Sequence, residues 1–228
     1  MSDMTEIDPP RGRLASVLNR LLDPETVELI LIRKTLLRDD LFGPPADVWE
    51  GPIFIHVPKA AGSSIVTAGA RMTYGHRPLS YYLRWRKREA MPRTFAVVRH
   101  PVDRFLSAFD YLKAGGRTAY DRRWVRRQRL AETDADAFAA ERLRRPEIRR
   151  WLHFRPQMEF LTDRSGAIAV DHVLRLETLD RDWPPLAAEL GLPVALDRVN
   201  EGRGERARPA LAEEALRALA EVYAVDFE

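Results

Sequence analysis

The chain has 228 residues, of which 45% are hydrophobic and 31% are charged, and it contains no cysteine. This length fits one main domain of roughly 100–200 residues with room for an extension, and the composition argues against disorder. The lack of cysteine excludes a disulfide framework, a thiolate metal site and a cysteine nucleophile.

No apolar run reaches the roughly 18 residues that a membrane-spanning helix needs. The longest candidate, residues 27–37, is interrupted by Glu28, Arg33 and Lys34. The first ten residues are acidic and lack the layout of a signal peptide. We therefore expect a cytoplasmic protein without a transmembrane segment, and we leave contact with a membrane surface open.

The net charge of +3 hides an uneven distribution of charge along the chain. Residues 71–155 hold 22 basic and nine acidic side chains, whereas the rest of the chain holds 15 basic and 25 acidic ones. A polyanion would suit this cationic stretch, and a solvated arginine-rich surface is the alternative. The arginines at 122–129 lack the interleaved aromatic residues of a nucleic-acid-binding motif, so we expect no nucleic-acid partner.

The first 50 residues predict a tail followed by helices. Apolar residues between positions 14 and 22 follow helical spacing, and Asp23-Pro24 ends that helix and begins another that runs through residue 37. Gly43-Pro44-Pro45 predicts a loop. We assign residues 1–50 to a tail with a helical extension and residues 51–228 to the main domain. We favour packing of the helices on that domain over a membrane-surface or dimer contact.

From residue 52 the pattern changes to alternating strands and helices. Short apolar, β-branched segments predict core strands buried on both faces at 52–57, 94–99 and 170–176. Helices are predicted at 63–74, 102–113, 134–144, 186–190 and 209–223. Strand, loop and helix in repeated order predict an α/β fold with a parallel sheet.

Residues 58–64, Pro-Lys-Ala-Ala-Gly-Ser-Ser, join the first strand to its helix. Backbone N–H groups and the helix dipole make such a position an anion site. Gly62 allows close approach of a ligand, Ser63 and Ser64 can donate to phosphate oxygens, and Lys59 is one of only four lysines. The loop is not the nucleotide-triphosphate loop, because Lys59 precedes Gly62 and no Lys-Ser/Thr pair is present for Mg²⁺. An ordinary capped turn is the alternative.

A second loop carries a candidate anion site of its own. Arg99 ends the second predicted strand, and Ser107 lies eight residues further on, within the next helix. An arginine at the carboxyl end of a strand and beside a helix suits a second phosphate group. A salt bridge at the sheet edge and an ordinary helix serine are the alternatives for these two residues.

Together, the two segments resemble the sulfotransferase family. They read FIHVPKAAGSS at 54–64 and VVRHPVDRFLSAF at 97–109, and the resemblance runs from about residue 52 to the C-terminus. Arg-Pro-Gln at 155–157 and Leu-Arg-Leu-Glu-Thr-Leu at 174–179 also look like the family's pattern. The branch that looks most similar is that of the carbohydrate sulfotransferases related to heparan sulfate 2-O-sulfotransferases, in a compact bacterial form.

The resemblance implies a P-loop-NTPase-like, three-layer fold with a central parallel sheet flanked by helices. It also implies a donor, 3′-phosphoadenosine 5′-phosphosulfate (PAPS, which leaves as PAP), and no metal. By resemblance, Arg99 and Ser107 would hold the 3′-phosphate. The 5′-phosphosulfate would lie against Lys59, Ala60, Ala61, Gly62, Ser63 and Ser64. The family usually has threonine or serine at the position of Ala60, so we expect weaker donor binding here.

Sulfuryl transfer needs stabilisation of charge on the leaving phosphate and removal of the acceptor's proton. Lys59 is the candidate for the first task. In the branch that this chain resembles, a histidine roughly 20 residues before the strand-end arginine is the base, and His76 lies 23 residues before Arg99. His56 is more simply explained as a core histidine, and His153 and His172 are weaker candidates.

We therefore predict an enzyme that moves a sulfuryl group in line from PAPS to an acceptor hydroxyl on a carbohydrate. One alternative is a non-catalytic nucleotide- or glycan-binding protein of the same fold. Another is a Mg²⁺-dependent P-loop kinase, against which the missing Gly-Lys-Ser/Thr argues. The sequence identifies neither the acceptor nor the oligomeric state.

Overall fold

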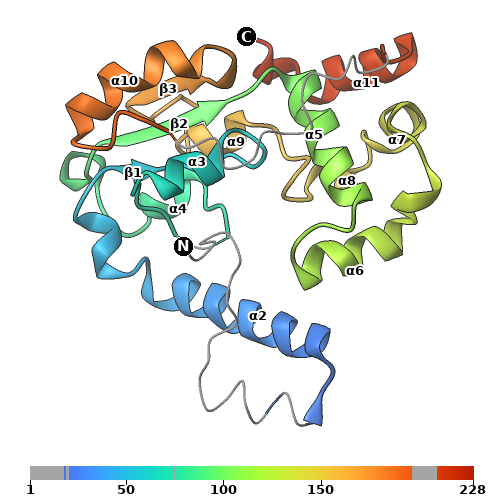
Figure 1. The fold of residues 1–228 in the computed structure, drawn as a ribbon, viewed down its shortest axis with the longest axis horizontal. Helices are drawn as coiled ribbons and strands as arrows, with labels where there is room; N and C mark the ends of the chain where they lie inside the picture. Colours follow the sequence, from blue (N-terminus) through green and yellow to red (C-terminus); the bar gives the residue numbers. More distant parts are fainter. Residues whose placement is uncertain (1–17, 19–20, 74, 197–209) are drawn as a thin grey trace. The chain divides into compact units, whose positions relative to one another are not determined.

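The computed structural model describes Leu18 and residues 21–73, 75–196 and 210–228. The chain forms two compact units (Figure 1). Among the described residues, the smaller unit comprises those up to Gly43 and Tyr111–Glu132, and the larger comprises those between Pro44 and Asp110 and those from Thr133 on. The helix predicted at 14–22 lies largely outside the described residues. The assignment of 1–50 and 51–228 to an extension and a main domain stays a prediction.

The larger unit holds all the strands of the described chain, β1 (Ile53–Phe54), β2 (Thr94–Val98) and β3 (His172–Arg175). Its α-helices are α3 (Gly62–Thr67), α4 (Leu79–Tyr82), α5 (Pro101–Lys113), α7 (Ala135–Arg142), α8 (Pro146–Arg149), α9 (Met158–Leu161), α10 (Leu179–Leu190) and α11 (Glu213–Val222). The last three residues of α5 belong to the smaller unit. Its 3₁₀ helices are η1 (Ala46–Trp49), η2 (Arg88–Ala90), η4 (Leu176–Thr178) and η5 (Ala224–Asp226).

The strands form a parallel sheet in the order β1-β2-β3, so β2 lies in the middle. Ile53 pairs with Thr94, and Val98 pairs with Arg175. On the other side of β1, Arg71 forms an isolated parallel bridge with Ile53. The crossovers after β1 and after β2 therefore run in opposite directions. In α/β sheets such a switch point, at the carboxyl ends of the strands, is where ligands bind.

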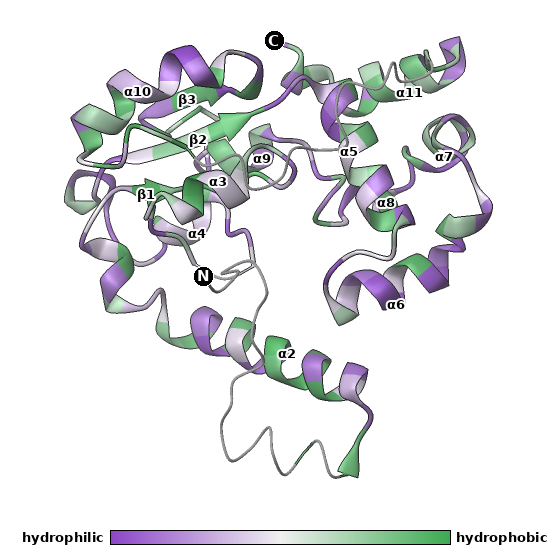
Figure 2. Cartoon of the chain, in the orientation of Figure 1, coloured by the Kyte–Doolittle hydropathy of each residue, from purple (hydrophilic) through white to green (hydrophobic). Residues whose placement is uncertain are grey.

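The core explains why these segments become strands. Phe54 and Phe95 are fully buried and stack at 5.2 Å between ring centroids, and Phe95 also contacts Trp183 of α10 at 5.8 Å. Burying each such ring stabilises the fold by roughly 1.5–3 kcal/mol. Figure 2 shows β2 as mostly hydrophobic, as expected of a strand covered on both faces. The predicted α/β fold with a central parallel sheet and packed helices is confirmed.

A second aromatic cluster anchors α5, the helix that follows the second loop. Phe105 lies 5.7 Å from Phe154, and Phe109 lies 5.6 Å from Phe138 of α7. Phe138 and Phe154 also contact each other at 5.1 Å. This packing fixes the start of α5, and with it the backbone at the end of β2.

Two helices differ from their predicted bounds by seven residues at one end. The helix predicted at 63–74 ends at Thr67, because Gly69 adopts a left-handed φ of 89° and the chain then returns to pair with β1. The helix predicted at 186–190 begins at Leu179 and contains Pro184 and Pro185. Proline disfavours a helix interior, but burial of Trp183 overrides that local preference.

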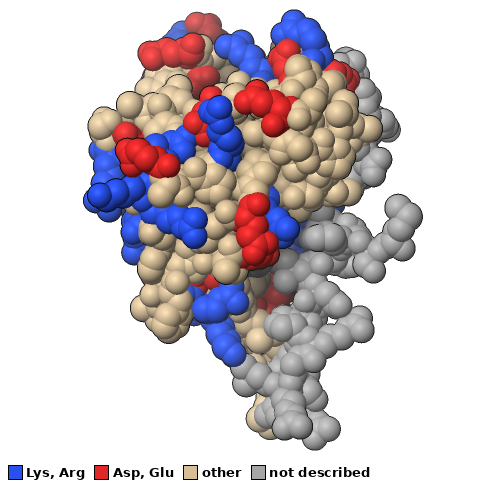
Figure 3. All heavy atoms as spheres, turned by 90° about the vertical axis from the view of Figure 1, so that its left-hand side faces the viewer, with Lys and Arg blue, Asp and Glu red and all other residues tan. Residues whose placement is uncertain are grey.

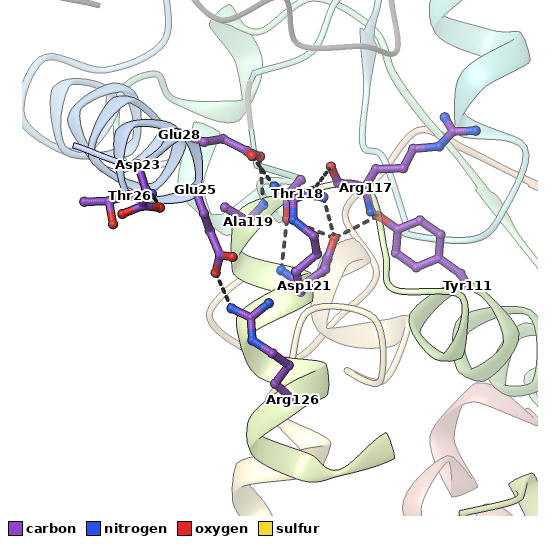
Figure 4. A network of polar contacts seen from close by, with 11 residues as sticks. Asp23, Glu25, Thr26, Glu28, Tyr111, Arg117, Thr118, Ala119, Asp121 and Arg126 are labelled. Atoms are coloured by element: carbon purple, nitrogen blue, oxygen red, sulfur yellow. Dashed lines mark hydrogen bonds and ion pairs between the residues drawn. The ribbon is translucent and has the colours of Figure 1, made fainter. Parts of the chain in front are cut away.

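The smaller unit is built on α2 (Pro24–Phe42), α6 (Ala119–Gln128) and η3 (Leu130–Glu132). Figure 4 shows polar contacts joining α2 to α6. Glu28 accepts a hydrogen bond from the backbone of Ala119 at 2.7 Å and pairs with Arg122. Thr118 and Asp121 form a capping box that starts α6. Acidic side chains of α2 thus pair with arginines of α6 and satisfy its first turn.

None of the helices in the described part of the chain combines the length and the apolar character that a membrane span requires.

Candidate functional site

The predicted site residues lie at the carboxyl edge of the sheet. Extending the register of β1 and β2 places Pro58 level with Arg99, and the register of β2 and β3 places Leu176 level with Arg99. The loops that follow the three strands therefore begin side by side. This edge includes the switch point between β1 and β2, the expected place for a ligand in such a sheet.

The loop after β1 has an unusual backbone. Lys59 and Ala61 have positive φ angles of 70° and 56°, whereas Ala60 between them does not. Left-handed conformations cost a non-glycine residue roughly 1–2 kcal/mol each, so the surrounding fold must impose them. Alternating handedness turns successive backbone N–H groups into a concave surface that attracts anions. Ser63 and Ser64 follow in the first turn of α3 and are half-buried.

Ala60 points into the protein rather than into the loop. It is fully buried and belongs to the hydrophobic core cluster around the sheet. Its methyl group therefore contributes to packing, while its backbone belongs to the turn. A larger side chain at this position would have to fit into the core.

Gly62 is required by His56. A Cβ at position 62 would lie 1.6 Å from Nε2 of His56, which is far inside any possible contact. Gly62 begins α3 and does not have a positive φ, so conformational freedom is not the reason for glycine. The sequence predicts that Gly62 allows a ligand to approach, whereas the structure places an imidazole against it.

His76 lies beside this loop. The pairing of Arg71 with Ile53 runs parallel to β1 and brings position 76 level with Pro58. Gly75 and His76 then turn the chain with left-handed φ angles of 84° and 54°. The His76 ring lies 4.0 Å from the His56 ring, and its Nδ1 lies 3.2 Å from the His56 carbonyl oxygen.

That hydrogen bond selects the tautomer of His76. A carbonyl oxygen only accepts, so Nδ1 of His76 carries the hydrogen and donates it. In the neutral ring the lone pair is then on Nε2, the nitrogen that a general base would use.

His56 is held neutral inside the cluster. Burial lowers the pKa of His56 well below its ordinary value of 6.5, and the neighbouring His76, His153 and Lys59 lower it further. Its Nδ1 is buried without a hydrogen-bond partner in the described structure. His153, which the sequence ranks as a weak candidate, thus lies close enough to act on His56. Nothing in the spacing of residues 56 and 153 signals this proximity.

Arg99 is fixed through its backbone. Its N–H donates to Oε1 of Gln157 at 2.9 Å, and its carbonyl accepts from Nε2 of Gln157 at 2.8 Å. The next N–H, of His100, donates to Oε1 of Glu177 at 2.6 Å. The segments 155–157 and 174–179, which resemble the family's pattern, thus hold the second loop in place.

Ser107 lies on α5, which begins just after Arg99. At 1.5 Å per residue it stands about 9 Å along the helix axis from Pro101. Its side chain is half-buried. The structure therefore places Ser107 on the helix that follows the second loop.

The positive charge of residues 71–155 is partly compensated within the chain. Acidic residues from outside that stretch form ion pairs with its arginines. Within the described residues, such pairs join Glu28 to Arg122, Glu25 to Arg126, Glu221 to Arg144 and Asp171 to Arg88. Figure 3 shows basic and acidic side chains interspersed on the face that it draws. The uneven sequence charge is thus in part an internal pairing.

Two surface depressions lie away from these loops. One of about 440 Å³ is lined by residues of β3 and α10, and one of about 580 Å³ is lined by Leu83, Arg84 and residues 163–165. Neither contains any of the predicted site residues. His172, a weak candidate for the base, lines the first of them.

The chain is thus an α/β protein in which the loops with Lys59, His76 and Arg99 meet at the switch point of a parallel sheet, where ligands bind in such folds. Residues 52–228 match the model of the sulfotransferase family, and the chain belongs to that family. The resemblance carried by the two loops is confirmed, and the protein is a transferase of sulfuryl groups. Searches of curated proteins and of solved structures gave no match.

Proposed function

We propose that the protein transfers the sulfuryl group of PAPS to an acceptor hydroxyl on a carbohydrate. The observation that carries this proposal is the convergence of the loop after β1, His76 and Arg99 at one edge of the sheet. Bound PAPS would supply a sulfuryl group activated by a phosphate leaving group.

The chemistry of the chain fits an anionic nucleotide. Lys59 and Ala61 have left-handed φ angles, and backbone of this kind can form a concave anion site from its N–H groups. The hydroxyls of Ser63 and Ser64 can donate to phosphate or sulfonate oxygens. The residues proposed to hold the 5′-phosphosulfate are Lys59, Ala60, Ala61, Gly62, Ser63 and Ser64. Ala60 takes part through its backbone, since its methyl group is buried in the core.

Arg99 is proposed to bind the 3′-phosphate together with Ser107. A guanidinium group binds phosphate with two parallel hydrogen bonds, which gives both energy and orientation. The pair of hydrogen bonds between the Gln157 side chain and the Arg99 backbone supports this role, because it holds the arginine at the strand end. The hydroxyl of Ser107 adds a neutral donor on the adjoining helix.

Lys59 is proposed to stabilise the negative charge that develops on the leaving phosphate. Its ammonium group is a compact point charge on a flexible stem and needs no metal for this task. The left-handed backbone at Lys59 supports a functional role, because strained residues of this kind cluster at active sites.

His76 is proposed to remove the proton of the acceptor hydroxyl. Its Nδ1 donates to the carbonyl of His56, which leaves Nε2 as the basic nitrogen. The lone pair on Nε2 of a neutral imidazole can accept a proton from a hydroxyl in the transition state. The proton would stay on Nε2 until solvent removes it.

The proposal is tested by thermal unfolding of the full chain with PAP, ADP or ATP with Mg²⁺. A ligand at 100 times its Kd stabilises the folded state by about 2.7 kcal/mol. We expect PAP to raise the Tm and ADP to have a much smaller effect. A shift with ATP and Mg²⁺ alone would favour a kinase.

Turnover separates an enzyme from a binding protein. Labelled PAPS is incubated with a panel of neutral and acidic saccharides, with a phenol and a peptide tyrosine as other hydroxyl acceptors. Label on a saccharide supports the proposal. Label on the phenol or tyrosine alone would overturn the carbohydrate acceptor. Binding of PAP without transfer to any acceptor would favour a non-catalytic protein of the same fold.

A further inference from the structure

The backbone hydrogen bonds at the end of β2 have unusual partners. Up to Val98 the strand pairs with β3, and its last pair is Val98 with Arg175. At Arg99 the amide side chain of Gln157 takes over and satisfies both the N–H and the carbonyl. Gln157 is only 3% exposed. If its amide were lost, the N–H and carbonyl of Arg99 would lose their hydrogen-bond partners at that buried position.

Gln157 is itself held by the C-terminal segment. Asp226 in η5 accepts from the backbone N–H of Gln157 at 2.8 Å and from that of Met158 at 2.9 Å. One carboxylate thus satisfies two free donors at the start of α9. Asp226 is half-buried, and burial raises the pKa of its carboxyl.

The residues just before Gln157 are held as firmly. Arg104 on α5 is fully buried and donates to the carbonyls of His153, at 3.1 Å, and of Arg155, at 2.7 Å. The hydroxyl of Tyr223 donates to the carbonyl of Phe154 at 2.8 Å. Hydrogen bonds from α5 and from the C-terminal segment therefore hold residues 153–158 in place.

We infer that Gln157 is a positioning residue for Arg99 and that Asp226 keeps Gln157 in place. This inference rests on the proposed function, in which the guanidinium of Arg99 binds the 3′-phosphate of the donor. The amide of Gln157 makes the two backbone hydrogen bonds that a neighbouring strand would otherwise make with Arg99. It fixes the peptide planes on both sides of Arg99, and these set the direction in which the side chain leaves the backbone.

Loss of Gln157 should affect the binding of the 3′-phosphate alone, because only Arg99 depends on its amide. If the amide is lost, the N–H and carbonyl of Arg99 must find other partners, and the backbone shifts to do so. A bidentate contact between guanidinium and phosphate tolerates little displacement. Both side-chain hydrogen bonds of Gln157 go to the Arg99 backbone rather than to the loop after β1, which is proposed to hold the 5′-phosphate. Loss of Gln157 should therefore weaken PAP binding and leave binding of adenosine 5′-phosphate nearly unchanged.

The experiment measures the Kd of PAP and of adenosine 5′-phosphate for four full-length proteins. These are the unmodified chain, Gln157→Met, Arg99→Met and Thr162→Val. Methionine has a volume close to that of glutamine and makes neither hydrogen bond. Thr162→Val is the matched control, because it removes the bond from Thr162 Oγ1 to the Met158 carbonyl at 3.0 Å, next to the same short helix.

We expect Gln157→Met to raise the Kd of PAP about tenfold, the effect of one lost charged contact. We expect the Kd of adenosine 5′-phosphate to change less than about twofold, and Thr162→Val to change neither. If Gln157→Met weakens both ligands equally or neither, Gln157 does not position Arg99. If Arg99→Met leaves the ratio of the two Kd values unchanged, the 3′-phosphate role of Arg99 is wrong and the positioning role falls with it.

The pH dependence of PAP binding by Gln157→Glu distinguishes positioning of Arg99 from a general structural role of Gln157. An ionised carboxylate cannot donate to the Arg99 carbonyl, whereas a protonated one can both donate and accept, as the amide does. Burial raises the pKa of such a carboxyl. Lowering the pH from 8 to 6 should therefore restore PAP affinity in Gln157→Glu relative to the unmodified chain and Gln157→Met. Parallel pH profiles for the three proteins would overturn the inference.

Discussion

The imidazole of His56 fills the space that a side chain at position 62 would need. A Cβ there would lie 1.6 Å from His56 Nε2 and 2.2 Å from His56 Cε1. The same ring lies 4.0 Å from the His76 ring. His56 therefore connects the loop after β1 with the proposed base, and the three positions have to be considered as one packed unit.

We predict that Gly62→Ala destabilises the protein and weakens PAP binding. The methyl group would displace His56, and overpacking of this kind costs about 1–3 kcal/mol. Chemical denaturation measures the change. Gly51→Ala is the control, because its added Cβ would meet only Arg71 Cγ at 4.0 Å.

The pair also predicts a compensation. Removing the ring in His56→Ala should make Gly62→Ala less harmful, so the double variant should be more stable than the sum of the single changes implies. Additive effects within about 0.5 kcal/mol would show that His56 and Gly62 do not press on each other.

The fold could be predicted from local pattern, and parts of the site could not. The buried strands are short runs of β-branched and aromatic residues, and this pattern is sufficient to place β2 at Thr94–Val98. The contact of Gln157 with Arg99 joins positions 58 apart, and that of Asp226 with Gln157 joins positions 69 apart. No periodicity encodes such pairs, because they arise only when separate elements pack together.

The sequence pattern likewise does not show which histidines lie together in the folded chain. The resemblance to the sulfotransferase family singles out His76 by its distance in sequence from Arg99, and the structure places it beside the loop. His56 reads as a core residue in the sequence, and only the tertiary structure shows its ring between Gly62 and His76. The end of α3 was missed for a related reason, since the pairing of Arg71 with β1 is a tertiary contact.

We predict an acid-sensitive stability that depends on His56. Its folded-state pKa lies well below 6.5 because the ring is buried, so below pH 6.5 the unfolded chain binds a proton that the folded chain does not. The free energy of unfolding should then fall with decreasing pH, with a slope from this group that approaches about 1.4 kcal/mol per pH unit once the unfolded imidazole is fully protonated. Denaturation between pH 7 and 5 should show a shallower decline for His56→Gln. Parallel curves would contradict the neutral, buried state of His56.

We predict that Lys59→Ala nearly abolishes transfer while the fold stays intact. Loss of one group that stabilises developing charge typically costs about 10²–10³ in kcat. Single-turnover transfer from labelled PAPS measures this, with circular dichroism to check the fold. Lys87→Ala is the control, since Lys87 is an exposed lysine in the turn before η2. A rate within about tenfold of the unmodified chain would show that Lys59 is not the charge stabiliser.

The last prediction separates the two nitrogens of His76. Asparagine can place its amide nitrogen near the position of Nδ1 and keep the bond to the His56 carbonyl, which is 3.2 Å long in the structure. Glutamine can place its amide nitrogen near Nε2. Neither side chain is a base at neutral pH. If His76 removes the acceptor's proton, both His76→Asn and His76→Gln should lower kcat by about 10²–10⁴ while the Kd of PAP stays nearly unchanged.

If His76 acts only by bracing the His56 backbone, His76→Asn should instead retain most of its turnover and His76→Gln should not. The pH dependence of kcat gives an independent check, because an essential base produces a fall in rate on its acidic side. That fall should be present in the unmodified chain and absent from the residual activity of both variants. Retained turnover in His76→Asn with an unchanged acidic limb would move the base to another residue, and His153 would be the first to test, since it already lies close enough to His56 to lower its pKa.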